Sequence, residues 1–133
     1  MEPIPTAEPT KPFRVQARLR SFTYAFRGIR FTVLSQHNAW IHAAATVVVV
    51  LAGVHFRISR SEWCLVILAS AAVWIAEALN TAVEAIADAT HREFHPLIGR
   101  AKDIAAGAVL IAAIAALGVG ILVFGPYLRS SSS

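Results

Sequence analysis

Three long apolar stretches dominate the hydrophobic pattern of this chain. They cover residues 39–56, 62–89 and 104–128. Each is close to the ~20 consecutive apolar residues that a helix needs to cross the hydrocarbon of a bilayer. The pattern therefore predicts three transmembrane helices and an all-α, integral membrane fold.

The segment at residues 13–35 has a different pattern, in which arginines alternate with large apolar side chains. The apolar positions recur mostly at spacings of three and four, which is typical of an amphipathic helix lying on a membrane surface. Residues 1–12 contain four of the six prolines and are expected to be a disordered leader, and residues 129–133 a solvated tail. Residues 13–128 then form a single membrane domain.

Composition supports this interpretation. The chain has 133 residues, of which 56% are hydrophobic and 15% charged, which is too apolar for an ordinary soluble domain. A net charge of +4 could suit nucleic acid, but the arginines lie beside apolar segments and no nucleic-acid motif is present, so we expect no nucleic-acid partner. Cys64 is the only cysteine, which excludes an intrachain disulfide.

The distribution of Lys and Arg predicts an orientation. Lys11 and five arginines precede the first span, three basic residues follow the second, and only Arg57 and Arg60 separate the first two spans. Because cytoplasmic segments carry the excess of basic residues, the N-terminus and the loop at 91–102 should be cytoplasmic.

Polar residues interrupt the second apolar stretch at helical spacing: Glu77, Asn80, Glu84 and Asp88. At about 100° per residue they fall on one narrow stripe of a helix. A carboxylate at membrane depth costs at least about 2.5 kcal/mol, so this acidic stripe should face other helices, water or a ligand. The deeper Glu77 would suit proton transfer, and the shallower Glu84 a divalent cation with oxygen ligands.

Two alternatives to a catalytic stripe stay open from the residues alone. The acids could pair with basic residues of neighbouring helices to fix packing, or could form an ion or proton pathway in a small non-enzymatic membrane protein. A second polar cluster, at the entry to the first span, includes Asn38 and His42 and is interpreted as hydrogen-bonded anchors at the membrane interface.

The loop at 91–102 carries two His, two Arg and one Lys above the acidic stripe. That combination suggests a clamp for a polyphosphate, with Lys102 for charge and Glu93 and His95 for polar contacts. Asp103 is expected to cap the third span, because Asp is a favoured N-cap residue. The sequence has no Gly-rich phosphate loop of the NTPase or kinase kind.

Several motifs together resemble the small prokaryotic diacylglycerol kinases, a family that includes undecaprenol kinases. The resemblance runs from about Arg18 to Phe124. Its motifs are Glu77-Ala-Leu-Asn80-Thr-Ala-Val-Glu84 with Asp88, then Glu93-Phe-His-Pro, Arg100-Ala-Lys102-Asp103, and Tyr24-Ala-Phe-Arg-Gly28-Ile. It implies a homotrimeric lipid kinase of the bacterial inner membrane that moves the γ-phosphoryl group of ATP to the hydroxyl of a membrane lipid.

The resemblance also implies roles for individual residues. Glu77 would be the catalytic base, supported by Asn80 and Asp88, and Glu84 would bind the Mg²⁺ that carries ATP. The nucleotide would be bound by Glu84 together with Tyr24, Glu93, Phe94, His95, Lys102 and Asp103.

Gln36 departs from the family pattern, which has a second metal-binding Glu at this position. Its carbonyl oxygen can still bind Mg²⁺ but brings no charge, so the metal would be held more weakly or with help from Asp88. The arginine that contacts the lipid in the family corresponds to Arg18 or Arg20, the neighbours of the aligned Ala17. A weakened family member is thus a further alternative, and the sequence does not choose between diacylglycerol and undecaprenol.

Overall fold

A computed structural model describes residues 15–35, 37–90 and 95–130 of the chain. Four helices account for nearly all of these residues: α1 (Val15–Ser35), α2 (His37–Phe56), α3 (Arg60–Thr90) and α4 (Pro96–Ser130). The described residues contain no strand, and α2, α3 and α4 are each long and apolar enough to cross a membrane. The all-α fold with three spans is therefore confirmed.

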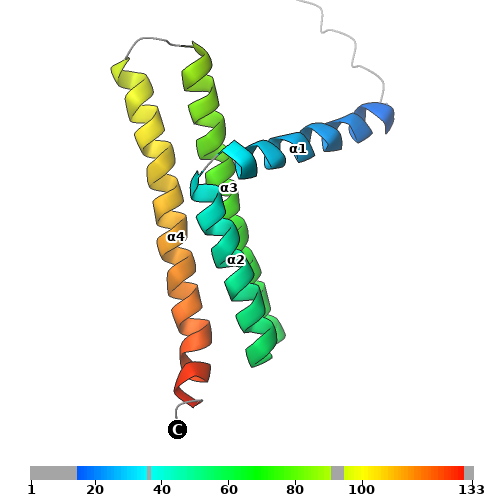
Figure 1. Ribbon diagram of the computed structural model, residues 1–133, viewed down its shortest axis with the longest axis vertical. Coiled ribbons are helices and arrows are strands. Elements are labelled where there is room, and N and C mark those ends of the chain that lie inside the picture. The colour runs from blue at the N-terminus through cyan, green and yellow to red at the C-terminus, as the bar shows by residue number, and fades with distance from the viewer. Residues whose placement is uncertain (1–14, 36, 91–94, 131–133) are drawn as a thin grey trace, which may run out of the picture.

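The three long helices run side by side, whereas α1 projects away from them across the long axis of the molecule (Figure 1). Helix α1 joins the bundle at its C-terminal end, where Thr32 is buried and its hydroxyl donates to the carbonyl of Gly28 at 3.2 Å. Large apolar side chains of α1, including Phe22 and Phe26, are exposed. This geometry suits a helix on a membrane surface, which stays a prediction.

The start of α4 corrects one expectation. Residues 96–102 are helical rather than part of a loop, so Asp103 lies inside the helix and is not its N-cap. His95 fills that position: its carbonyl accepts the N–H groups of Ile98 and Gly99, and its Nδ1 accepts that of Leu97 at 3.3 Å. Pro96 suits the first helical position because no hydrogen bond is needed from its nitrogen there. Hydrophobicity predicts only the membrane-spanning part of α4, whereas the helix itself begins earlier, at Pro96.

The other helices also exceed the predicted spans, by two residues at the start of α2 and by two at the start and one at the end of α3. Polar residues continue these helices beyond the apolar stretch, as hydrogen bonding along a helix does not depend on hydrophobicity. The predicted leader and the last three residues of the predicted tail, Ser131 to Ser133, lie outside the described residues.

The turn between α2 and α3 is closed by hydrogen bonds at both helix ends. Arg57 has φ 51°, and the N–H groups of Arg57 and Ile58 donate to the carbonyls of Val54 and Gly53 at 3.3 and 3.2 Å. These two bonds form a Schellman motif, which satisfies the last carbonyls of α2.

A capping box then starts α3. The N–H of Ser59 donates to Glu62 Oε2 at 2.7 Å, and the N–H of Glu62 donates to Ser59 Oγ at 3.3 Å. The hydroxyl of Tyr127 also donates to Glu62 Oε2, at 2.9 Å. This contact ties the C-terminal part of α4 to the start of α3.

The best-packed apolar core lies at this same end of the bundle. Ile58, Val66 and Val123 are buried there, with Trp63 and Phe124 packed against them. Most large apolar side chains elsewhere on the three spans are exposed, as expected for helices that face lipid. The bundle is thus firmly held at one end, and the polar stripe lies toward the other.

Gly53 permits the close approach of α2 to Trp63. A Cβ at Gly53 would lie 2.7 Å from the indole ring of Trp63, whereas a Cβ at Gly118 would meet no atom within 4 Å. We expect Gly53→Ala to destabilise the protein by about 1–3 kcal/mol through overpacking. Gly118→Ala should not destabilise it. The free energy of unfolding of both variants is measured in detergent micelles. Equal values would show that the indole ring of Trp63 does not limit the size of the side chain at position 53.

Candidate active site

Glu77 on α3 is the most deeply buried charged side chain among the described residues, with an exposed fraction of 0%. Neither of its carboxylate oxygens has a hydrogen-bond partner there. The imidazole of His42 on α2 lies nearby, with its Nε2 3.8 Å from Glu77 Oε2. A buried carboxylate without hydrogen bonds is costly, so its retention points to a functional role.

Asn80 and Glu84 continue the stripe toward the end of α3. Asn80 Nδ2 donates to Glu84 Oε1 at 3.2 Å, while the buried Oδ1 of Asn80 has no hydrogen-bond partner among the described residues. Together with Glu77 they line a cavity of about 270 Å³, to which α2 and α4 also contribute lining residues. Three of the four residues of the predicted stripe thus line one cavity, and Asp88 is not among its lining residues.

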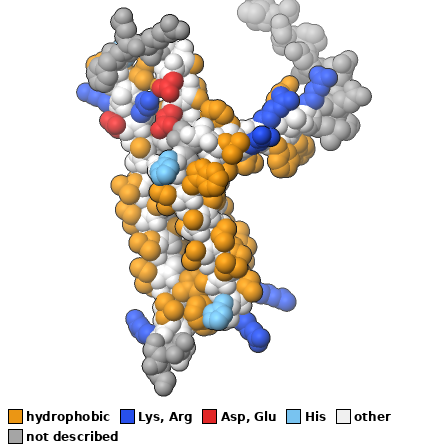
Figure 2. Space-filling model, in the orientation of Figure 1, with side chains coloured by type: hydrophobic (Ala, Val, Ile, Leu, Met, Phe, Trp, Pro, Cys, Tyr) orange, Lys and Arg blue, Asp and Glu red, His pale blue; other side chains and the backbone are white. Residues whose placement is uncertain are grey.

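Asp88 and Lys102 form an ion pair beyond this cavity. Lys102 Nζ on α4 lies 3.2 Å from Asp88 Oδ1 on α3, and their side chains are 41% and 74% exposed. Acidic and basic side chains gather at this end of the bundle, while its body is largely apolar (Figure 2). An exposed ion pair contributes at most about 1 kcal/mol, so both groups can exchange this contact for another partner.

The other predicted site residues that the structure describes do not line the cavity. Tyr24 is exposed on α1, with the guanidinium of Arg27 over its ring at 5.9 Å, and Arg20 is exposed on the same helix. Asp103 is exposed on α4. The described residues do not include Gln36, Glu93 or Phe94, nor the side chain of Arg18.

His42 is the site residue that sequence reasoning assigned to a different role. It lines the cavity together with Asn38, one turn earlier on α2. The four-residue spacing of these two polar side chains was the available signal, since it puts both on one face of the helix. Which face of α3 they would meet depends on how the two helices pack.

The cavity offers oxygen donors that fit a hard divalent cation. The described residues contain no group of three His, Cys, Asp or Glu side chains that could hold a metal ion. Mg²⁺, however, is usually bound through one or two carboxylates, with water and phosphate oxygens completing its shell. The carboxylate of Glu84 and the unpartnered Oδ1 of Asn80 supply ligands of that kind.

The fold and site define an integral membrane protein with a buried acidic cavity beneath an exposed ion pair. Residues 23–124 match the family described as prokaryotic diacylglycerol kinase. An undecaprenol kinase of Bacillus subtilis (strain 168) is 38% identical over 109 residues, which cover 82% of this chain and 89% of that protein.

Two diacylglycerol kinases are also similar. That of Synechocystis sp. is 39% identical over 126 residues, covering 88% of this chain and 72% of the relative. That of Escherichia coli (strain K12) is 31% identical over 99 residues, covering 74% and 81%. The chain belongs to the prokaryotic diacylglycerol kinase family and is a membrane lipid kinase. A non-enzymatic ion pathway is not favoured.

The position of His42 leads to a test. We expect His42→Ala to lower kcat for lipid phosphorylation by about tenfold or more, because the side chain beside Glu77 is lost. His55→Ala, an exposed position near the far end of α2, provides the control, and equal kcat values for the two variants would contradict a role for His42.

Proposed function

We propose that the protein transfers the γ-phosphoryl group of ATP to the hydroxyl of a membrane lipid, diacylglycerol or undecaprenol, in the cavity that contains Glu77. The observation that carries the proposal is a fully buried carboxylate whose two oxygens lack hydrogen-bond donors. A lipid hydroxyl entering from the bilayer would supply the missing donor. Phosphoryl transfer depends chiefly on positioning and charge stabilisation, which this site can provide.

Glu77 acts as general base in this proposal. The lipid O–H donates a hydrogen bond to one of its carboxylate oxygens, and the proton passes to Glu77 as the lipid oxygen attacks the γ-phosphorus. The bond from that phosphorus to the bridging oxygen then breaks, and ADP leaves. The imidazole of His42, whose Nε2 lies 3.8 Å from Glu77 Oε2, would restrict the orientation of this carboxylate.

Glu84 and Asn80 are the proposed ligands for Mg²⁺, and support comes from their adjacent oxygen atoms in the same cavity. The bound ion would neutralise charge on the phosphates. Lys102 would exchange Asp88 for the polyphosphate, because their ion pair is exposed. By analogy with the family, the nucleotide site would be completed by Tyr24, Glu93, Phe94, His95 and Asp103. Gln36 would offer a weak metal ligand, and the lipid would be contacted by Arg18 or Arg20.

A homotrimer in the bacterial inner membrane is also proposed, with Lys102 and Asp88 on the cytoplasmic side. The outer face of α3 supports self-association. Exposed apolar residues on this face follow a strict alternation of spacings of three and four: Leu65, Leu68, Ala72, Ile75, Leu79, Ala82 and Ile86. Such a repeat is typical of a helix that packs against other helices along its whole length.

The base is tested by Glu77→Gln, which keeps the shape of the side chain but removes its ability to accept the proton. We expect phosphorylation of both lipids to fall by about a hundredfold or more, with the oligomer intact in detergent. Glu62→Gln removes a carboxylate from the opposite end of the same helix and should keep the activity. Comparable phosphorylation by Glu77→Gln and the native protein would refute the assignment.

The nucleotide side is tested by Lys102→Ala. We expect Mg²⁺-dependent binding of a non-hydrolysable ATP analogue to weaken by about tenfold or more, because a cation that faces the phosphates is lost. Arg129→Ala, at the other end of α4, is the control for loss of a positive charge. Calorimetric titration of the purified protein measures both, and unchanged affinity in Lys102→Ala would place the phosphates elsewhere.

A further inference from the structure

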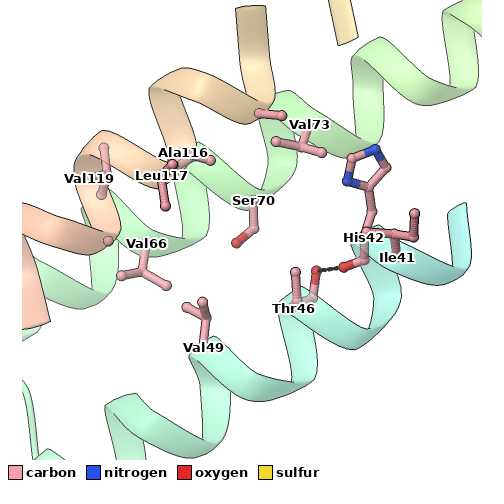
Figure 3. A pocket seen from close by; sticks show the side chains of 14 residues that line it. Ile41, His42, Thr46, Val49, Val66, Ser70, Val73, Ala116, Leu117 and Val119 are labelled. Carbon is pink, nitrogen blue, oxygen red and sulfur yellow. Dashed lines mark hydrogen bonds between the residues drawn. The ribbon is translucent and has the colours of Figure 1, made fainter. Parts of the chain in front are cut away.

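A second cavity, of about 340 Å³, lies deeper in the bundle between α2, α3 and α4 (Figure 3). Its wall includes Val49 of α2, Val66 and Ser70 of α3, and Ala116 and Gly120 of α4. It shares Ile41, His42 and Ala113 with the cavity of Glu77. The two spaces therefore adjoin, and together they are called the groove, which begins at the acidic stripe and runs along α3 toward the cluster of Ile58, Val66 and Val123.

The deeper part of this groove has an apolar wall. His42, Thr46 and Ser70 are the polar residues among those that line it. His42 stands at the junction with the upper cavity, and the hydroxyl of Thr46 is already used, since it donates to the His42 carbonyl at 2.7 Å and accepts from the Trp74 indole at 3.1 Å. Such a wall suits a hydrocarbon and offers little to a polar or charged ligand.

The length of the groove suits a hydrocarbon chain. Glu77 and Val66 are separated by eleven residues of α3, or about 16 Å at 1.5 Å per residue. A lipid alcohol with its hydroxyl at Glu77 would thus extend its chain along the groove as far as Val66.

We propose that this groove binds the hydrocarbon chain of the lipid substrate and so makes the kinase selective for chain length. The inference rests on the proposed function, because it takes the reacting hydroxyl to lie at Glu77. Small residues of α4, Ala113, Ala116 and Gly120, leave room for the chain. Selectivity follows because a chain that reaches the deep end contacts this wall and a short one does not.

Gly120 and Gly118 offer a matched test. A Cβ at either position would meet no atom within 4 Å, but only Gly120 lines the groove. We expect Gly120→Leu to lower kcat/KM for dioleoylglycerol and undecaprenol by about tenfold, since its side chain occupies the deep end. Activity on dioctanoylglycerol and farnesol should be unchanged, and Gly118→Leu should retain activity on all four alcohols.

Three results would overturn the proposal. The first is full activity of Gly120→Leu on the long-chain alcohols, and the second is an equal loss of kcat/KM on short-chain and long-chain alcohols. The third is dissociation of the oligomer by Gly120→Leu but not by Gly118→Leu, which would assign the groove to a second copy of the chain. Failure of the proposed function looks different, because the native protein would then phosphorylate none of the four alcohols.

A second pair of variants covers the case in which Gly120→Leu does not fold. Ala116→Leu narrows the middle of the groove, and Ala115→Leu adds the same group on an exposed part of α4. The proposal requires the same selective loss on long-chain alcohols from Ala116→Leu and none from Ala115→Leu. Equal activity profiles for these two variants would contradict it.

Discussion

The burial of the Glu77 carboxylate is the constraint on which the arrangement of the spans depends. A group that is fully enclosed and lacks hydrogen-bond donors destabilises the bundle locally, so packing elsewhere has to offset its cost. The structure divides these tasks along its length. Close contact of Gly53 with Trp63 and the cluster of Ile58, Val66 and Val123 stabilise one end, and the other end can keep open space around polar groups.

Periodicity was sufficient to predict the three spans and the common face of Glu77, Asn80 and Glu84, because both depend on the geometry of single helices. It could not predict that His42 lies beside Glu77, since that contact depends on the register between α2 and α3. The early start of α4 was missed for another reason. Hydropathy reports which residues prefer lipid, whereas the beginning of α4 is determined by hydrogen bonds to His95.

Helix α3 serves two purposes on opposite faces. The acidic stripe faces the cavity, and the apolar repeat that includes Leu68, Ile75 and Leu79 lies on the outside. In a trimer built on that repeat, little of α3 would contact lipid. Its polar residues would then lie close to the assembly interface without forming part of it, so that assembly and chemistry could respond separately to substitution.

The helical extension of α4 beyond the membrane-spanning part affects how a nucleotide would be received. Residues 96–102 belong to a continuous helix, so the backbone that carries Lys102 is already ordered before any ligand binds. A cation on a loop would lose backbone entropy of about 1–2 kcal/mol per residue fixed on binding, whereas here mainly side-chain rotation of Lys102 is restricted. The helix thereby fixes the distance between the backbone that carries this charge and the membrane-spanning part of α4.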